Sequence, residues 1–262
     1  MKPEKPIKSY RQGYSTAIKT RKIEMMLMEK YNISEGIDMK AMYKRYITLP
    51  GAGRLGGWIF ERHALLQTSL TYKERSRGLL KDTFPMEIML NQKNLVFSVP
   101  NKAEAISFGP GGDLPHPLQH RTLTFIDKMK DVRFDDDADI DINEGYFVPT
   151  DVGNPLFDAV FFQLNSEPPV MWVVQVSTDA TGKPPGSRQD YPVLEETKER
   201  AQEWVDKGGY LVDKPVQIRF MFVVPQKTQK RLQDIRFKLP DPGDTEKEKW
   251  SGVKVYVQFV EF

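Results

Sequence analysis

Two short runs of this sequence, residues 157–163 (FDAVFFQ) and 170–177 (VMWVVQVS), are almost continuously apolar and are separated only by the turn LNSEPP. Apolar runs of this length bounded by turn residues favour strands, and the turn pairs these two as a hairpin. Residues 193–206 then repeat apolar side chains on one helical face, and residues 216–225 (VQIRFMFVVP) have the composition of a buried strand. The second half of the chain is therefore predicted to contain a hairpin followed by a strand–helix–strand unit.

The first half is predicted to add helices and short strands. Residues 16–31 form a short amphipathic helix, and apolar residues recur at steps of three and four from Arg54 to Thr71. Between residues 83 and 134 the period drops to two, which indicates short and mostly antiparallel strands at MEIML, LVFSV, AISFG, TLTFI and VRF. This order favours an α/β sandwich, with a mixed β-sheet flanked by helices and a short helical N-terminal segment.

Composition excludes several classes of protein. The chain has 262 residues, of which 39% are hydrophobic, so it can bury a substantial core. It has no cysteine, which excludes disulfides, thiolate metal sites and a cysteine nucleophile. No run approaches the roughly 18 apolar residues of a membrane span, and the opening residues MKPEKPIKSYRQG lack the apolar stretch of a signal peptide. We therefore expect a soluble chain with no membrane partner.

Charge is distributed unevenly along the chain. Residues 1–50 carry 11 Lys and Arg against 5 Asp and Glu, although the whole chain has a net charge of only +2. A basic N-terminal segment of this kind is either a docking helix with solvated charges or an arm that contacts phosphates, for example through Lys19, Arg21 and Lys22. We expect a basic helical segment over residues 1–48 and a single domain over residues 49–262.

The common site motifs are absent or incomplete. Residues 51–56 (GAGRLG) fit the glycine pattern of dinucleotide-binding loops. Pro50 precedes them, however, where that loop needs a buried strand. No phosphate-binding loop of the GxxxxGK[ST] type and no G-x-S-x-G elbow occurs. The acidic run at residues 135–141 has Ile140 where a calcium loop needs glycine, and the two histidines of HPLQH lack a helix to align them.

Polar residues interrupt the apolar strands at a few positions. Asp158 opens the first strand of the hairpin, and Gln175 interrupts the second, with Ser177 two residues later on the same strand face. An unpaired buried polar group costs roughly 1–3 kcal/mol, so these side chains should have partners. One candidate partner is Mg²⁺, bound by the Asp158 carboxylate, the Gln175 amide oxygen and the Val176 carbonyl, with Glu61 joining from the first helix.

Simpler interpretations of each residue remain open. Asp158 is also placed to cap a turn after Asn154–Pro155, Gln175 to bridge backbone groups in the core, and Glu61 to be an exposed helix acid.

Four segments occur in an order that resembles the nuclease-like domain of Crinkler effectors and retrotransposon hot spot proteins: GAGRLGGWIFERHAL, YFVPTDVGNPLFDAVFF, VMWVVQVST and FMFVVP. These domains belong to the restriction-endonuclease-like PD-(D/E)xK superfamily, and the resemblance covers about residues 49–262. It implies a restriction-endonuclease-like sandwich and an Mg²⁺- or Mn²⁺-dependent nuclease that acts on DNA, with RNA less favoured. It also implies that host nuclear proteins are partners. The implied place of action is a nucleus, which for a secreted effector would be the nucleus of the host, or the cytoplasm.

The resemblance assigns roles to five residues. It places the metal-binding aspartate at Asp158, the helix glutamate at Glu61 and the acidic or amide position at Gln175, and it puts Ser177 where such enzymes carry a lysine. Lys183, just downstream, either reaches back to replace that lysine or is an ordinary surface residue. The departure at Ser177 keeps two other functions open: a catalytically degenerate module that binds nucleic acid or a host protein, and a structural interaction protein.

Overall fold

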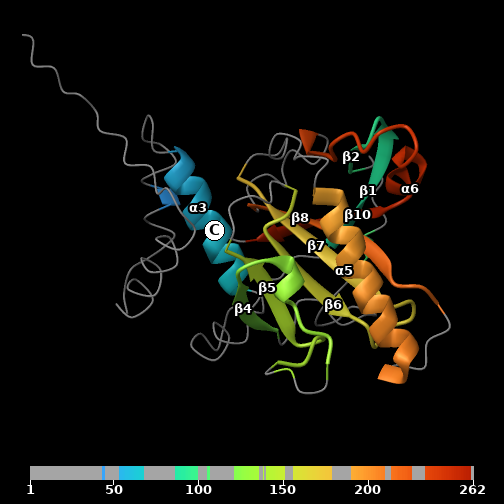
Figure 1. The fold of residues 1–262 in the computed structure, drawn as a ribbon. Helices are drawn as coiled ribbons and strands as arrows, with labels where there is room; N and C mark the ends of the chain where they lie inside the picture. The colour runs from blue at the N-terminus through green and yellow to red at the C-terminus, as the bar shows by residue number, and fades with distance from the viewer. Residues whose placement is uncertain are drawn as a thin grey trace, which may run out of the picture.

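The computed structural model describes residues 43–44, 53–67, 86–99, 105–106, 121–135, 138, 140–150, 156–178, 190–209, 214–225 and 234–260. In this part of the chain the fold is mixed α/β, with one large mixed sheet and few helices (Figure 1). The amphipathic helix predicted at residues 16–31, the loop HPLQH and Lys183 lie outside the described residues, as does part of the acidic run.

The helices are α3 (Gly53–Gln67), α5 (Asp190–Trp204) and α6 (Lys247–Ser251), together with the 3-10 turn η2 (Met129–Asp131) and the π-helical turn η3 (Val205–Gly209). The strands are β1 (Met86–Lys93), β2 (Val96–Ser98), β3 (Ala105–Ile106), β4 (Thr122–Ile126), β5 (Gly145–Pro149), β6 (Ala159–Gln163), β7 (Val170–Val176), β8 (Gln217–Pro225), β9 (Arg236–Lys238) and β10 (Lys254–Val260). None of the described helices is long and apolar enough to cross a membrane.

The sheet has the strand order β4-β5-β6-β7-β8-β10-β1-β2-β9, and β3 pairs with β1. β6 runs antiparallel to both of its neighbours, β5 and β7, whereas β7, β8 and β10 run parallel to one another. The hairpin predicted at residues 157–163 and 170–177 is confirmed as β6 and β7, with Ala159 opposite Val174 and Gln163 opposite Val170. The strand–helix–strand unit is confirmed as β7, α5 and β8.

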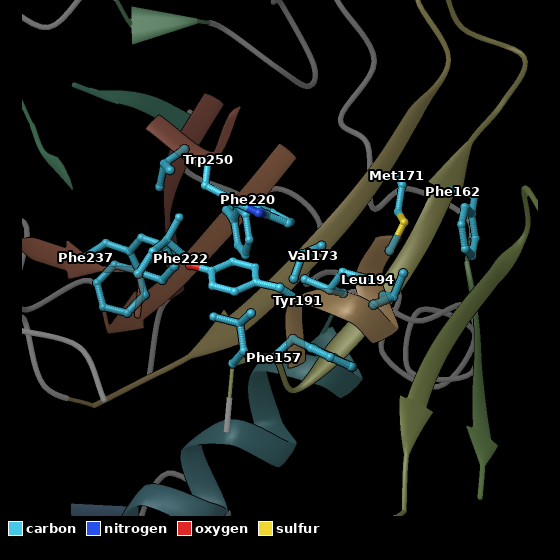
Figure 2. Packing of buried hydrophobic residues seen from close by; sticks show 14 of the residues in the cluster. Phe157, Phe162, Met171, Val173, Tyr191, Leu194, Phe220, Phe222, Phe237 and Trp250 are labelled. Atoms are coloured by element: carbon cyan, nitrogen blue, oxygen red, sulfur yellow. The ribbon is translucent and has the colours of Figure 1, made fainter. Parts of the chain in front are cut away.

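The two faces of the sheet carry separate apolar clusters, because successive strand residues point to opposite faces. Met171 and Val173 of β7 pack in the cluster beneath α5, and Trp172 and Val174 pack in the cluster that contains α3 (Figures 1 and 2). The helical periodicity that we identified produces these contacts, since α5 buries Tyr191, Leu194, Thr197 and Ala201 along one side. The described helices therefore cover both faces of the central strands.

Three expectations differ from the structure. Residues 132–134 (VRF) form no strand; instead the Val132 carbonyl accepts a hydrogen bond from Arg200 of α5, and that guanidinium lies 5.1 Å from the centre of the Phe134 ring. β4 pairs parallel to β5, an exception to the mostly antiparallel strands expected between residues 83 and 134, of which β1 does pair antiparallel with β2 and β3. β5, β9 and β10 were not predicted, although β10 lies between β8 and β1 in the sheet.

Candidate functional site

The candidate site lies at the open end of the β6–β7 hairpin, opposite its turn. Asp158 immediately precedes β6 and is 7% exposed. Its backbone N–H donates to the Val174 carbonyl at 2.7 Å, and its carboxylate Oδ2 accepts a hydrogen bond from the Val176 N–H at 2.7 Å. The carboxylate is thus fixed against the last residue of β7, 18 positions along the chain, inside an otherwise apolar part of the sheet.

Gln175 and Ser177 come from the neighbouring strand and are also buried, at 4% and 7% exposure. Gln175 follows Val173 by two residues, so strand alternation puts it on the face that α5 covers. The Ser177 N–H donates to the Val223 carbonyl at 2.9 Å, which holds the end of β7 to β8. The structure therefore brings the Asp158 carboxylate to the backbone between Gln175 and Ser177.

Glu61 approaches this end of β7 from the other side of the sheet. It is half-buried on α3, the helix that packs against the face carrying Val174 and Val176. A Cβ atom at Gly57, one helical turn earlier, would lie 3.9 Å from Thr178 Oγ1, so the start of α3 lies beside the residues that follow β7. Residues four apart share one side of a helix, and Glu61 is therefore directed to the same region as Gly57.

One buried acid at this site was missed from the sequence. Asp190, the first residue of α5, is 4% exposed, and its Oδ2 accepts a hydrogen bond from the Leu156 N–H at 3.1 Å. Burial raises the pKa of Asp190, and the hydrogen bond from Leu156 opposes that rise. The sequence placed Asp190 in a loop three residues before the helix predicted at residues 193–206, whereas α5 begins at Asp190 itself. An acid at such a position is ordinarily a solvated residue that favours a helix N-terminus.

A second buried charge, Arg121, was also missed, and its donors are used for structure. Its guanidinium donates to the carbonyls of Asn143 at 2.6 Å and Gly145 at 3.3 Å, and it lies 4.4 Å from the centre of the Phe161 ring. Burial lowers the pKa of Arg121 to about 9, while Tyr146 and then Asp141 act in the opposite direction. This arginine fixes the start of β4 and is not a candidate for phosphate binding.

The residues at the open end of the hairpin match a hard divalent cation in the type of donor they offer. Carboxylate, amide and carbonyl oxygens are the ligands that Mg²⁺ and Mn²⁺ prefer. Asp158, Gln175 and the Val176 carbonyl supply one of each type, so most of the remaining coordination would be water. Within the described residues, no group of three or more His, Cys, Asp or Glu is arranged to hold a metal. In the type of donor alone, these three oxygens fit such a cation.

Comparison of the chain with protein-family models, curated proteins and solved structures gave no match.

Proposed function

We propose that this chain is a metal-dependent phosphodiesterase that acts on DNA, with RNA as the less favoured substrate. The observation that carries the proposal is the buried carboxylate of Asp158, held at 2.7 Å by the Val176 N–H beside Gln175. Ordinary strand pairing would give the Val176 N–H a backbone acceptor, without any charge. A buried carboxylate opposes folding unless it is well hydrogen-bonded. A charge kept at such a position is typical of a site with a chemical role.

We also propose that the fold is the restriction-endonuclease-like sandwich of the PD-(D/E)xK superfamily. Its support is the mixed sheet with α3 against one face and α5 against the other. An acid at the start of one hairpin strand and an amide near the end of its partner agree with the order of motifs in Crinkler and retrotransposon hot spot domains. The proposed place of action, a nucleus or the cytoplasm, follows from the same resemblance.

In this proposal a bound Mg²⁺ or Mn²⁺ supplies Lewis-acid chemistry at the scissile phosphate. Asp158 contributes the anionic ligand oxygen, and the Val176 N–H fixes the direction of that carboxylate. Gln175 contributes a neutral oxygen and therefore leaves more positive charge on the site for the phosphate. Glu61 lies on α3, which packs against the opposite face of the sheet from Gln175, so any contribution that it makes would come from beyond the end of β7.

A second candidate function is a degenerate module that binds nucleic acid or a host nuclear protein without cleaving. Two observations favour this function. Ser177 stands where the superfamily carries lysine. Gln175 is neutral, so Asp158 is the only carboxylate among the three buried residues Asp158, Gln175 and Ser177. Lys183 would have to supply the positive charge of the missing lysine side chain, and Lys183 lies outside the described residues.

Plasmid cleavage in Mg²⁺ and in Mn²⁺ separates these functions. We expect the wild-type chain to cleave and Asp158→Asn to lose at least about 100-fold in rate, because the amide keeps an acceptor for the Val176 N–H and removes the ligand charge. Glu167→Ala, an exposed acid in the turn of the same hairpin, is the matched control and should retain full activity. Cleavage that persists in Asp158→Asn and Asp158→Ala would refute the assigned site.

The same preparations test the second candidate. DNA retention that weakens with salt, without turnover in either metal, would support a binding module. Failure of the wild-type chain to retain or cleave DNA or RNA at low salt would refute both nucleic-acid functions, and would favour a module that binds a protein or a structural interaction protein.

A further inference from the structure

We propose that Asp190 is a positioning residue for Asp158, acting through the backbone of the segment Leu156–Asp158; this role rests on the proposed function. Asp190 does not need to touch a metal or substrate in this arrangement. Its carboxylate instead holds the N–H of Leu156, two residues before Asp158, at 3.1 Å.

Three hydrogen bonds to two elements fix this short segment. Leu156 is bound by Asp190 of α5, the Asp158 N–H donates to Val174 of β7, and the Asp158 carboxylate accepts from Val176 of β7. Phe157 lies between them, 2% exposed, in the same apolar cluster as Tyr191 (Figure 2). The segment that delivers Asp158 is therefore clamped at its first residue by α5 and at its last residue by β7.

The anchor itself is rigid. Tyr191, the next residue of α5, donates its hydroxyl hydrogen to the Pro240 carbonyl at 2.7 Å, and its ring centre lies 4.2 Å from that of Trp250. Because the first turn of α5 is held in this way, the Asp190 carboxylate has little freedom to follow Leu156. A shift of Leu156 would therefore break the hydrogen bond rather than move the helix.

Folding alone requires an acceptor for the buried Leu156 N–H, but that acceptor need not be a charged one. A helix-terminal acid is favourable when it remains in water, whereas Asp190 is 4% exposed and its Oδ2 binds a residue 34 positions away. Hydrogen bonds to an ionised acceptor are shorter and stronger than neutral ones, so a carboxylate restrains Leu156 more tightly than an amide would. Outer partners that orient metal ligands typically change metal affinity or activity by about 10- to 100-fold when they are removed.

The test compares Asp190→Ala and Asp190→Asn with Asp206→Ala, an exposed acid that bonds Gln202 at the other end of the same helical segment. The first measurement is hydrogen exchange of the Val176 amide in metal-free full-length protein. We expect exchange to accelerate at least about fivefold in Asp190→Ala, as for one weakened hydrogen bond. Asp190→Asn should fall between this variant and the wild type, and Asp206→Ala should match the wild type.

The second measurement is the Mn²⁺ concentration that gives half-maximal binding and half-maximal plasmid cleavage. Asp190→Ala should raise both by about tenfold, with partial rescue in Asp190→Asn. A merely structural role would lower the unfolding midpoint without moving the Mn²⁺ dependence, and that result would overturn the proposal.

The two measurements separate the two hypotheses. Wild-type exchange at Val176 in Asp190→Ala overturns the role of Asp190, whatever activity the wild-type chain has. A wild-type chain that neither binds Mn²⁺ nor cleaves overturns the proposed function instead. Exchange at Val176 then decides whether Asp190 positions Asp158: it must accelerate by more than the loss of unfolding free energy in Asp190→Ala explains, and an acceleration that matches that loss overturns the role. If Asp190→Ala does not fold, Asp190→Asn carries the same comparisons, because it removes the charge and keeps an acceptor.

Discussion

The two ends of the β6–β7 hairpin carry polar residues in opposite ways. At the turn, Glu167 and Lys214 form an ion pair at 2.9 Å with side chains 72% and 56% exposed. At the open end, Asp158 and Gln175 are at most 7% exposed. Polar groups at the turn remain in water at little cost, whereas those at the open end have been taken out of water and must be held by specific bonds. The contrast between the ends, rather than the presence of polar residues, makes the open end the candidate site.

The largest effect should come from removing the Asp158 carboxylate. Asp158→Ala leaves the buried Val176 N–H without its acceptor and should lower the free energy of unfolding by about 1–3 kcal/mol. Asp158→Asn should lose less, since its carbonyl can still accept the hydrogen bond. Urea unfolding gives both values, and equal stability of Asp158→Ala and the wild type would remove the contrast between the two ends.

A smaller loss is expected at the turn from Trp172→Phe. The indole N–H donates to Gln163 Oε1 at 2.6 Å, and the ring stacks on Phe161 with centres 5.8 Å apart. Phenylalanine keeps a ring on Phe161 but removes the donor and part of a fully buried side chain, so the lost hydrogen bond and the cavity together should cost about 1–2 kcal/mol in the same unfolding assay. A loss larger than that of Asp158→Ala would show that the turn, and not the open end, contains the hairpin's most important polar contact.

The strands and helices could be predicted from the sequence further than the contacts between distant residues. The hairpin, α3 and α5 followed from local apolar patterns, and the sequence also indicated Asp158 and Gln175 because they interrupt apolar strands. The contact of Asp190 could not be predicted, because its partner Leu156 lies 34 positions away and the two meet only after α5 packs on the sheet. β10 was missed although residues 254–260 (KVYVQFV) are an apolar run like those of β6 and β7, and only its place between β8 and β1 depends on long-range packing.

A third test follows the pH dependence of Asp190→Asn. Burial raises the pKa of Asp190 in the folded chain, so the folded state binds this proton more tightly than the unfolded state does. The resulting stability is complete below the ordinary pKa of an aspartate and is lost as pH rises through the raised value. The variant, which does not titrate there, should therefore gain stability relative to the wild type as pH rises from about 3 to about 7.

Thermal unfolding across that pH range measures the trend, with Glu167→Gln at the exposed turn as the control. A stability difference between Asp190→Asn and the wild type that stays constant with pH would contradict the prediction.

The smallest effect should come from Lys214→Ala. Its ion pair with Glu167 is exposed, so the loss should be below about 1 kcal/mol and should shrink as salt is added. Unfolding at low and high ionic strength checks this prediction. A larger loss that is insensitive to salt would mean that the turn is desolvated as well.

The position of β10 has a consequence for how the protein is made. This strand lies between β8 and β1, although β1 is the first described strand along the chain and β10 is the last. During synthesis on the ribosome, β8 therefore emerges with one long side of unpaired backbone groups that β1 cannot cover. The edge of β8 stays unpaired until β10 has been synthesised. The nascent chain is therefore most in need of a chaperone in the interval before β10 emerges.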